Sequence, residues 1–172
     1  GFHRSGKWFA CEWDEVIPDL ICVGKALSGG FPISACVGKA EVMDQWPESS
    51  GEALHTSTFL GHPVGCAMAL KSLEILARPG TGEMVRKASK NLRKVLRNLD
   101  QKAIVEVRGR GLMLGLELDK NAGPLLAKLL AEGLVFLADG PAGNVLSFTP
   151  PFVISEEEVE FATGAISRLL QS

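Results

Sequence analysis

The stretch Pro18-Asp19-Leu20-Ile21-Cys22-Val23-Gly24-Lys25-Ala26-Leu27-Ser28-Gly29-Gly30 decides the fold class of this chain. Its apolar run, Leu20–Val23, ends at a glycine, which is the pattern of a short buried strand. The residues that follow have the composition of a turn. A second apolar run, Ile33–Val37, also ends at a glycine. The first part of the chain, about 75 residues, therefore predicts an α/β arrangement with glycine-rich connections.

The remainder alternates helical and strand-like patterns on both sides of a break at Pro79-Gly80-Thr81-Gly82. Pro63 predicts the start of a helix that stops before this break. Beyond the break, apolar spacing predicts a helix over Met84–Leu99, and a capping box at Ser155 and Glu158 predicts another. The other expected elements are strands over 104–107, 112–118, 134–137 and 145–148 and a short helix over 124–132. We expect two domains, residues 1–79 and 80–172, the second a small α+β domain ordered α–β–β–α–β–β–α.

The composition is that of a globular protein. The chain has 172 residues, of which 46% are hydrophobic and 22% charged, with a net charge of −2. The acidic balance argues against nucleic acid or an anionic membrane surface as the partner, because those ligands need clustered Lys and Arg. No uncharged apolar run approaches the roughly 18 residues of a membrane-spanning helix.

The cysteines at positions 11, 22, 36 and 66 form no Cys-x-x-Cys pair, and they do not combine with the three histidines at a zinc-finger spacing. We therefore expect no structural metal site. Cys22 and Cys36 lie inside apolar runs, which predicts buried free thiols in a reducing cytoplasm.

Lys25 is the first candidate for chemistry. It follows the end of a predicted buried strand, where ligands bind in open α/β sheets. Partial desolvation there would favour the neutral amine that Schiff-base chemistry requires. From spacing alone, an exposed turn lysine is the commoner alternative.

Ser57-Thr58 is the second candidate, because hydroxyl groups and free N–H groups near a helix start suit a phosphate. The alternative is a cap or a turn hydroxyl. Two nucleotide-binding patterns fail. Gly24-Lys25 is followed by Ala26, which excludes a P-loop, and the glycines of Gly109–Gly115 are spaced wrongly for a dinucleotide site.

Several stretches, in order, resemble class III pyridoxal-phosphate aminotransferases, the relatives of ornithine, acetylornithine and 4-aminobutyrate aminotransferase. They are GFHRSGKWFA (1–10), PDLICVGKALSGG (18–30), HTSTFLGHP (55–63), VRGRGLM (107–113) and FTPP (148–151). The resemblance covers nearly the whole chain and implies part of the fold type I of pyridoxal-phosphate-dependent transferases, an α/β fold. Residues 1–79 would be the end of the large cofactor domain, and residues 80–172 the small C-terminal domain.

The resemblance also implies roles for the two candidates. Lys25 would hold pyridoxal 5'-phosphate as a Schiff base and then transfer a proton as general acid–base. Thr58, with Ser57 beside it, would bind the cofactor phosphate in the site of another subunit, so a homodimer or larger homo-oligomer is expected. The expected partners are a small-molecule amino donor and a 2-oxo acid acceptor, and the expected location is the cytoplasm.

The resemblance has gaps. The family's acid beside the pyridine nitrogen belongs to an Asp-Glu-x-Gln segment just before the position of Gly1. That segment and the glycine-rich phosphate loop upstream of it are outside these residues. We therefore expect a C-terminal fragment that is inactive alone.

The chain also departs from the family at two positions. Ser147 stands where many members carry an arginine that pairs with a substrate carboxylate. Amines, diamines and ω-amino acids thereby become more plausible donors, unless Arg4, Arg108 or Arg110 compensates. For Arg108 a structural ion pair is the favoured interpretation. His62 replaces a usual Asn and is interpreted as a local turn substitution.

Two other functions stay open. The chain could belong to another fold type I enzyme, such as an aminomutase or a decarboxylase. It could also be a non-catalytic homologue that acts only in assembly, although a scaffold has no need of the amine of Lys25.

Overall fold

The computed structural model describes residues 1–51, 57–99 and 102–171. Contacts within the chain divide it into two compact units. The first unit consists of Gly1–Phe2 and Lys7–Thr81, and the second of His3–Gly6 and Gly82–Ser172. The short segment His3–Gly6 therefore packs with residues that follow much later in the sequence.

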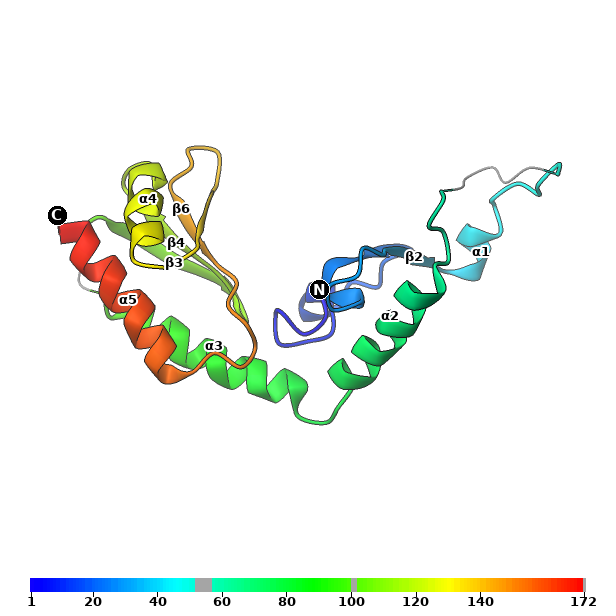
Figure 1. The fold of residues 1–172 in the computed structure, drawn as a ribbon, viewed down its shortest axis with the longest axis horizontal. Coiled ribbons are helices and arrows are strands. Elements are labelled where there is room, and N and C mark those ends of the chain that lie inside the picture. Colours follow the sequence, from blue (N-terminus) through cyan, green and yellow to red (C-terminus); the bar gives the residue numbers. More distant parts are fainter. Residues whose placement is uncertain (52–56, 100–101, 172) are drawn as a thin grey trace. The chain divides into compact units, whose positions relative to one another are not determined.

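The first unit contains a two-stranded antiparallel sheet and one long helix (Figure 1). Strand β1 pairs with β2 in a register that places Leu20 opposite Gly38. The predicted strand over residues 20–23 and the predicted helix from Pro63 are confirmed, whereas β2 begins two residues later than expected. In chain order the elements are the 3-10 turn η1 (Ala10–Asp14), β1 (Leu20–Val23), the 3-10 turn η2 (Lys25–Leu27), β2 (Ala35–Gly38), α1 (Ala40–Met43) and α2 (Pro63–Leu76).

The expectation that β1 is a buried strand, with buried thiols at Cys22 and Cys36, is wrong for the described chain. Both cysteines are exposed, and Leu20 is 48% exposed. Among the described residues β1 pairs with β2 and with no other strand, so β1 is not flanked by strands on both sides as a strand inside a larger sheet is. Val23, on the opposite face, packs against the small core formed by Phe2, Leu27 and Ala69.

The second unit has three helices packed on one antiparallel sheet of strand order β3-β4-β6-β5. Its predicted element order is confirmed. The elements are α3 (Thr81–Arg97), β3 (Ile104–Arg110), β4 (Met113–Leu118), α4 (Gly123–Ala131), β5 (Leu137–Asp139), β6 (Val145–Phe148) and α5 (Glu156–Gln171).

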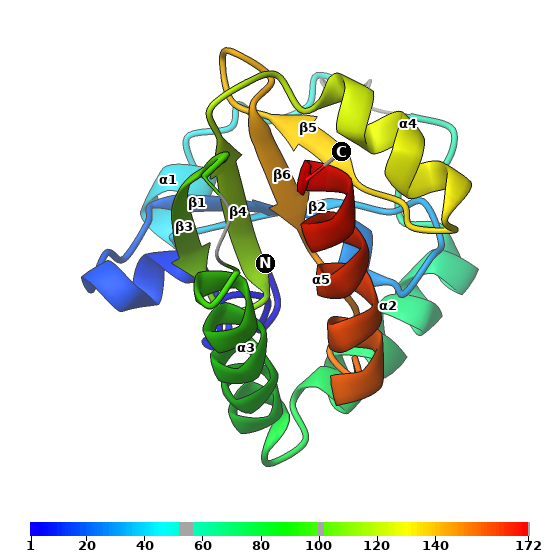
Figure 2. The same cartoon turned by 90° about the vertical axis from the view of Figure 1, so that its left-hand side faces the viewer.

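The core of the second unit lies between its sheet and its helices (Figure 2). Leu114, Leu116 and Leu118 alternate along β4 and are buried, because successive strand residues point to opposite faces. They pack with Leu96 of α3 and Ile166 of α5. Each such leucine contributes roughly 1.5–3 kcal/mol by burial. In the described part of this unit, core residues of α3, α4 and α5 pack against this face of the sheet.

One predicted strand is misplaced. Residues 134–136 are not in a strand, and β5 is confined to Leu137–Asp139. The backbone N–H of Leu134 donates to the carbonyl of Leu129 at 2.9 Å, so it closes the end of α4 instead of a sheet ladder. Leu134 and Phe136 still pack against the core, which explains their apolar character.

Within the described residues, no helix is long and apolar enough to cross a membrane. The same residues contain no group of three or more His, Cys, Asp or Glu side chains that could hold a metal ion.

Candidate functional site

Lys25 lies in a tight turn directly after β1. Its backbone has a φ of 48°, in the left-handed region that residues other than glycine rarely occupy. The turn is closed by a hydrogen bond from the N–H of Leu27 to the carbonyl of Gly24 at 3.0 Å. The buried side chain of Leu27 anchors it to the core of the first unit. A left-handed conformation costs about 1–2 kcal/mol and persists only where the surroundings hold it.

Two serine hydroxyls hold the backbone around this turn by hydrogen bonds. Ser72 of α2 donates to the carbonyl of Ala26 at 2.8 Å, and buried Ser28 donates to the carbonyl of Phe31. Sequence reasoning missed both contacts. Ser72 could have been found, because it shares helical spacing with Ala69 and Leu76, which pack in the same core.

The side chain of Lys25 is exposed. The partial desolvation expected for its amine is therefore not provided by the residues that the structure describes. What sets Lys25 apart from an ordinary surface lysine is its left-handed backbone conformation and not burial of its side chain.

A second lysine provides an internal comparison. The pentapeptide Cys-Val-Gly-Lys-Ala occurs at 22–26 and again at 36–40. Lys39 has an ordinary φ of −62° at the start of α1, and its Nζ lies 2.7 Å from Oδ1 of Asp19. The hydrogen bond from Lys39 lowers the pKa of Asp19, although the pair is exposed. Within the described residues no acid holds Lys25 in this way. The same pentapeptide therefore places its lysine in two different environments.

Ser57 and Thr58 lie in an exposed turn before α2. The carbonyl of Ser57 accepts from the N–H of Leu60 at 3.1 Å. The neighbouring residues His55 and Thr56 of the same motif lie outside the described residues. The hydroxyl of Thr58 thus precedes a helix start, as the sequence predicts.

His62 has a more specific part than the turn substitution that we expected. It is the N-cap of α2, and its Nδ1 accepts from the N–H of Gly65 at 3.5 Å. Its ring lies 5.0 Å from that of Phe31 between centroids. His62 therefore caps the start of α2 as an Asn would, and it adds an aromatic contact with Phe31.

Lys25 and Thr58 lie near different parts of α2. The Lys25 turn contacts α2 at Ser72, whereas Thr58 precedes the helix start at Pro63. These positions on α2 are separated by about 14 Å of helix axis.

The register places the Ser147 position on the face of the second unit's sheet opposite the core residues Leu146 and Phe148. The strand registers place it beside Gly115, and Gly115 beside Arg108. Arg108 is held by Glu106 at 3.0 Å and by a short contact with Glu117. The hydrogen bond with Glu117 is the main reason that the pKa of Arg108 is raised, and it lowers the pKa of Glu117 in turn. The predicted structural ion pair of Arg108 is confirmed.

Arg4 is also engaged in structure. Its guanidinium donates to the carbonyls of Pro150 and Leu112 and lies 4.8 Å from the ring centroid of Phe152. Burial lowers its pKa. Arg110 lies opposite Met113, one row further from Ser147 on the same face. Neither Arg4 nor Arg108 is therefore available to replace the arginine that Ser147 lacks.

Ser147 also lines a cavity of about 540 Å³ in the second unit. The walls of this cavity are mostly apolar and include Phe136, Phe148 and Phe161. The neutral side chain of Ser147 cannot form the ion pair that an arginine would offer to a carboxylate.

Comparison with known proteins identifies the family. Residues 1–170 match the family model described as "Aminotransferase class-III". The chain belongs to the class III aminotransferase family. This class III chain is 40% identical over 171 residues to an ornithine aminotransferase of Bacillus anthracis and 38% identical over 173 residues to that of Bacillus subtilis (strain 168). It spans 42% of the length of each.

Solved structures of the family confirm the predicted fold class. The ornithine aminotransferase from Toxoplasma gondii ME49 gives a TM-score of 0.84 at 35% identity, covering 99% of this chain and 41% of that one. An adenosylmethionine-8-amino-7-oxononanoate aminotransferase from Methanocaldococcus jannaschii gives 0.84 at 31%, covering 99% and 43%. The chain thus has part of the type I fold, with mixed α/β content. Class III aminotransferases depend on pyridoxal phosphate.

Proposed function

We propose that this chain is part of a transaminase that moves an amino group from an amine, ω-amino acid or amino acid donor to a 2-oxo acid. One observation carries the proposal: Lys25 is held in a left-handed turn after β1, while the identical pentapeptide at 36–40 gives Lys39 an ordinary backbone and an acidic partner. The family and its ornithine aminotransferase relatives support the reaction type.

The residues present fit pyridoxal phosphate at two points. The exposed ε-amino group of Lys25 would hold it covalently, and Gly29 and Gly30 leave open space beside the turn, because nothing lies within 4 Å of a Cβ placed there. The hydroxyl of Thr58, assisted by Ser57, would take its phosphate. When bound, the cofactor supplies an electron sink for the deprotonated substrate carbon. The ε-amino group of Lys25 then accepts and returns the substrate proton.

We infer that the complete site is shared between subunits of a homodimer or larger homo-oligomer. About 14 Å of helix axis separate the Lys25 turn from the Thr58 end of α2. The resemblance to the family places Thr58 at the cofactor phosphate of another subunit, so the lysine and the phosphate ligand of one subunit would serve different cofactors.

Ser147 supports a preference for donors that bring no carboxylate to its position. It is neutral, and the nearby Arg108 is already neutralised by Glu106 and Glu117. Diamines and ω-amino acids, whose reacting amine is remote from any α-carboxylate, fit this surface better than α-amino acids.

The attachment of the cofactor can be tested at lysine resolution. The purified chain is incubated with pyridoxal phosphate, reduced with borohydride and digested with trypsin. Reduced Lys25 resists cleavage and joins residues 8–25 to 26–39 in one peptide. Arginine at either position keeps the trypsin site, so we expect the joined peptide carrying the reduced cofactor to dominate in the wild type and in Lys39→Arg, and to be lost in Lys25→Arg.

Equal labelling of Lys25 and Lys39 would contradict the proposal. Turnover is a separate question, because the family's acid for the pyridine nitrogen is outside these 172 residues. We expect no transamination by this chain alone with a diamine or an α-amino acid donor.

A further inference from the structure

Two cysteines face each other across the β1–β2 ribbon. The register places Cys22 directly opposite Cys36 in the antiparallel ladder. Directly opposed residues have Cα atoms about 4.5–5.5 Å apart and side chains on the same face. This spacing lies within the Cα range of disulfides, about 4.4–6.8 Å.

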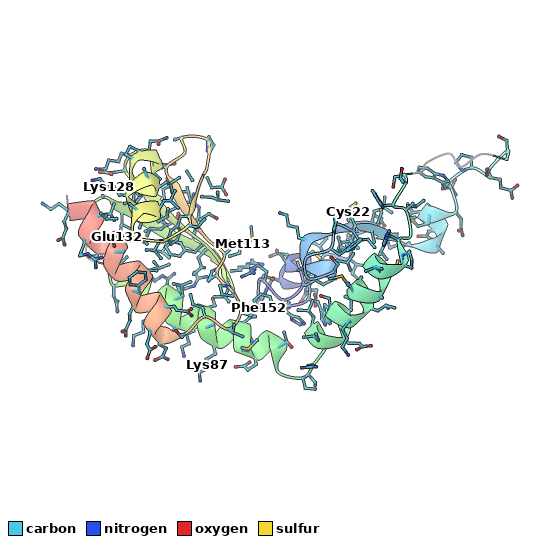
Figure 3. The ribbon with its side chains drawn as sticks, in the orientation of Figure 1. Cys22, Lys87, Met113, Lys128, Glu132 and Phe152 are labelled. Atoms are coloured by element: carbon cyan, nitrogen blue, oxygen red, sulfur yellow. The ribbon has the colours of Figure 1, made fainter. Side chains whose placement is uncertain are left out.

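The two facing thiol groups are accessible in the described chain. A hydrogen bond with Cys22 is the largest cause that raises the pKa of Cys36. Both residues are exposed in the described chain, and Figure 3 labels Cys22 on β1. The other two cysteines lie elsewhere, Cys11 in η1 and Cys66 in α2.

We propose that Cys22 and Cys36 form a dithiol site that a low-molecular-weight disulfide, such as oxidised glutathione, converts to a cross-strand disulfide. This inference does not depend on the proposed transaminase function. It rests on the strand register, the shared face and the exposure of both side chains.

The reaction consists of two exchanges. The thiolate of Cys22 attacks one sulfur of oxidised glutathione, so that the glutathione S–S bond breaks and one glutathione thiolate leaves. The thiolate of Cys36, directly opposite on β2, then attacks the sulfur of Cys22. The second glutathione leaves. Two protein thiols are oxidised, one glutathione disulfide is reduced, and the two thiol protons pass to the glutathione thiolates.

The disulfide would close a loop around the turn of Lys25. Residues 22–36 contain Gly24, Lys25 and all of η2. Oxidation would therefore fix both ends of the segment that carries the candidate catalytic lysine. Reduction would free them again.

Trypsin separates the two cysteines, which allows a direct test. Cleavage after Lys7, Lys25 and Lys39 places Cys22 in peptide 8–25 and Cys36 in peptide 26–39. A Cys11→Ser/Cys66→Ser double variant leaves only the proposed pair. After treatment with oxidised glutathione and blocking of free thiols with iodoacetamide, we expect the two peptides to be joined, and a reductant to separate them.

Three controls show whether the disulfide depends on the closeness of Cys22 and Cys36 or only on the reactivity of single thiols. Cys36→Ser in the double-variant background should give a glutathione adduct on Cys22 and no joined peptides. The complementary Cys22→Ser/Cys36→Ser variant should form no intramolecular disulfide, since Cys11 in η1 and Cys66 in α2 are not opposed in a strand ladder. The same disulfide should also form in the wild-type chain, where fragment masses show which cysteines are linked. This result does not depend on the folding of the variants. Separate glutathione adducts on Cys22 and Cys36 without a joined peptide would overturn the proposal.

Discussion

At the scale of single residues, Lys25 and Lys39 show the limit of local sequence. Both follow Cys-Val-Gly and precede Ala, so the pentapeptide alone predicts the same environment for both. Contacts with distant residues separate them: Ser72 holds the carbonyl of Ala26, and Asp19 holds the amine of Lys39. The wider motif around Lys25 did identify the correct candidate family. The serine contacts and the left-handed φ depend on tertiary packing and could not be predicted.

Substitution of Gly65 tests how closely α2 must approach Phe31, in the segment after the Lys25 turn. A Cβ at this position would lie 2.8 Å from two ring carbons of Phe31, so Gly65→Ala forces the ring or the helix to move. We expect a loss of about 1–3 kcal/mol in the free energy of unfolding of the first unit. Tryptophan fluorescence in urea reports on this unit, because Trp8, Trp13 and Trp46 all belong to it.

Gly24→Ala is the matched control for this substitution. A Cβ there would meet Ser34 at 3.6 Å, an ordinary contact. The control should keep the wild-type midpoint to within about 0.5 kcal/mol. A wild-type midpoint for Gly65→Ala would show that α2 does not need this close approach.

At the scale of elements, patterns that depend on neighbours in sequence were predicted well. The capping box of α5 is present, with Glu158 N–H donating to Ser155 Oγ at 3.1 Å and Ser155 N–H donating to Glu158 at 2.7 Å. The alternation along β4 also matched its burial. The burial of β1 was not predicted correctly, because an apolar run does not specify what covers it. The strand at 134–137 was misplaced for a related reason: Leu134 and Phe136 are apolar for the core but are not part of a ladder.

The β3–β4 ion pair predicts an acid sensitivity of the second unit. The hydrogen bond from Arg108 lowers the pKa of Glu117 below its ordinary value of 4.5. A carboxylate with a lowered native pKa stabilises the fold above its unfolded pKa, and this contribution is lost as the pH falls through the native value. We expect the urea midpoint, followed by circular dichroism of the helices, to fall less steeply below pH 4.5 in Glu117→Gln than in the wild type.

Arg108→Met provides the cross-check, because it removes the cause of the shift and keeps the carboxyl group. The double variant Arg108→Met/Glu117→Gln should then differ little from either single variant in the pH dependence of its stability. Parallel acid curves for the wild type and Glu117→Gln would exclude the pair as a source of this sensitivity.

At the scale of the whole molecule, the chain passes from one unit to the other three times, after Phe2, after Gly6 and after Thr81. The sequence indicated a break at Pro79–Gly82, because Pro and Gly end both element types. It gave no sign that His3–Gly6 packs with the second unit. That placement rests on Arg4, whose carbonyl accepts from the N–H of Leu112 at 2.9 Å and whose guanidinium contacts Phe152. The assignment of residues 1–79 to a cofactor domain stays a prediction.

Gly111 tests this placement. Its φ is 57°, and a Cβ there would lie 2.4 Å from the carbonyl oxygen of Arg4 and 2.6 Å from the Cα of Ser5. Gly133 also has a positive φ, 82°, but nothing lies within 4 Å of its Cβ position. Gly133→Ala should cost about 1–2 kcal/mol of backbone strain alone. Gly111→Ala should cost at least about 1 kcal/mol more, because it also displaces the Arg4–Ser5 backbone.

Urea unfolding followed by circular dichroism measures both variants in the same unit. Equal losses for the two alanine substitutions would mean that His3–Gly6 contributes nothing to the stability of that unit.

The position of Arg4 also has a consequence for the order in which the protein is made. A ribosome releases Arg4 long before Leu112, the residue that receives its hydrogen bond 108 positions later. The first unit can close soon after Thr81 emerges, whereas the second must capture a segment that was made 108 residues before Leu112. Closing so long a loop is entropically costly and slows folding. Until the turn at Gly111 appears, His3–Gly6 has no docking place, and the nascent chain must carry it unpacked while the intervening residues are made.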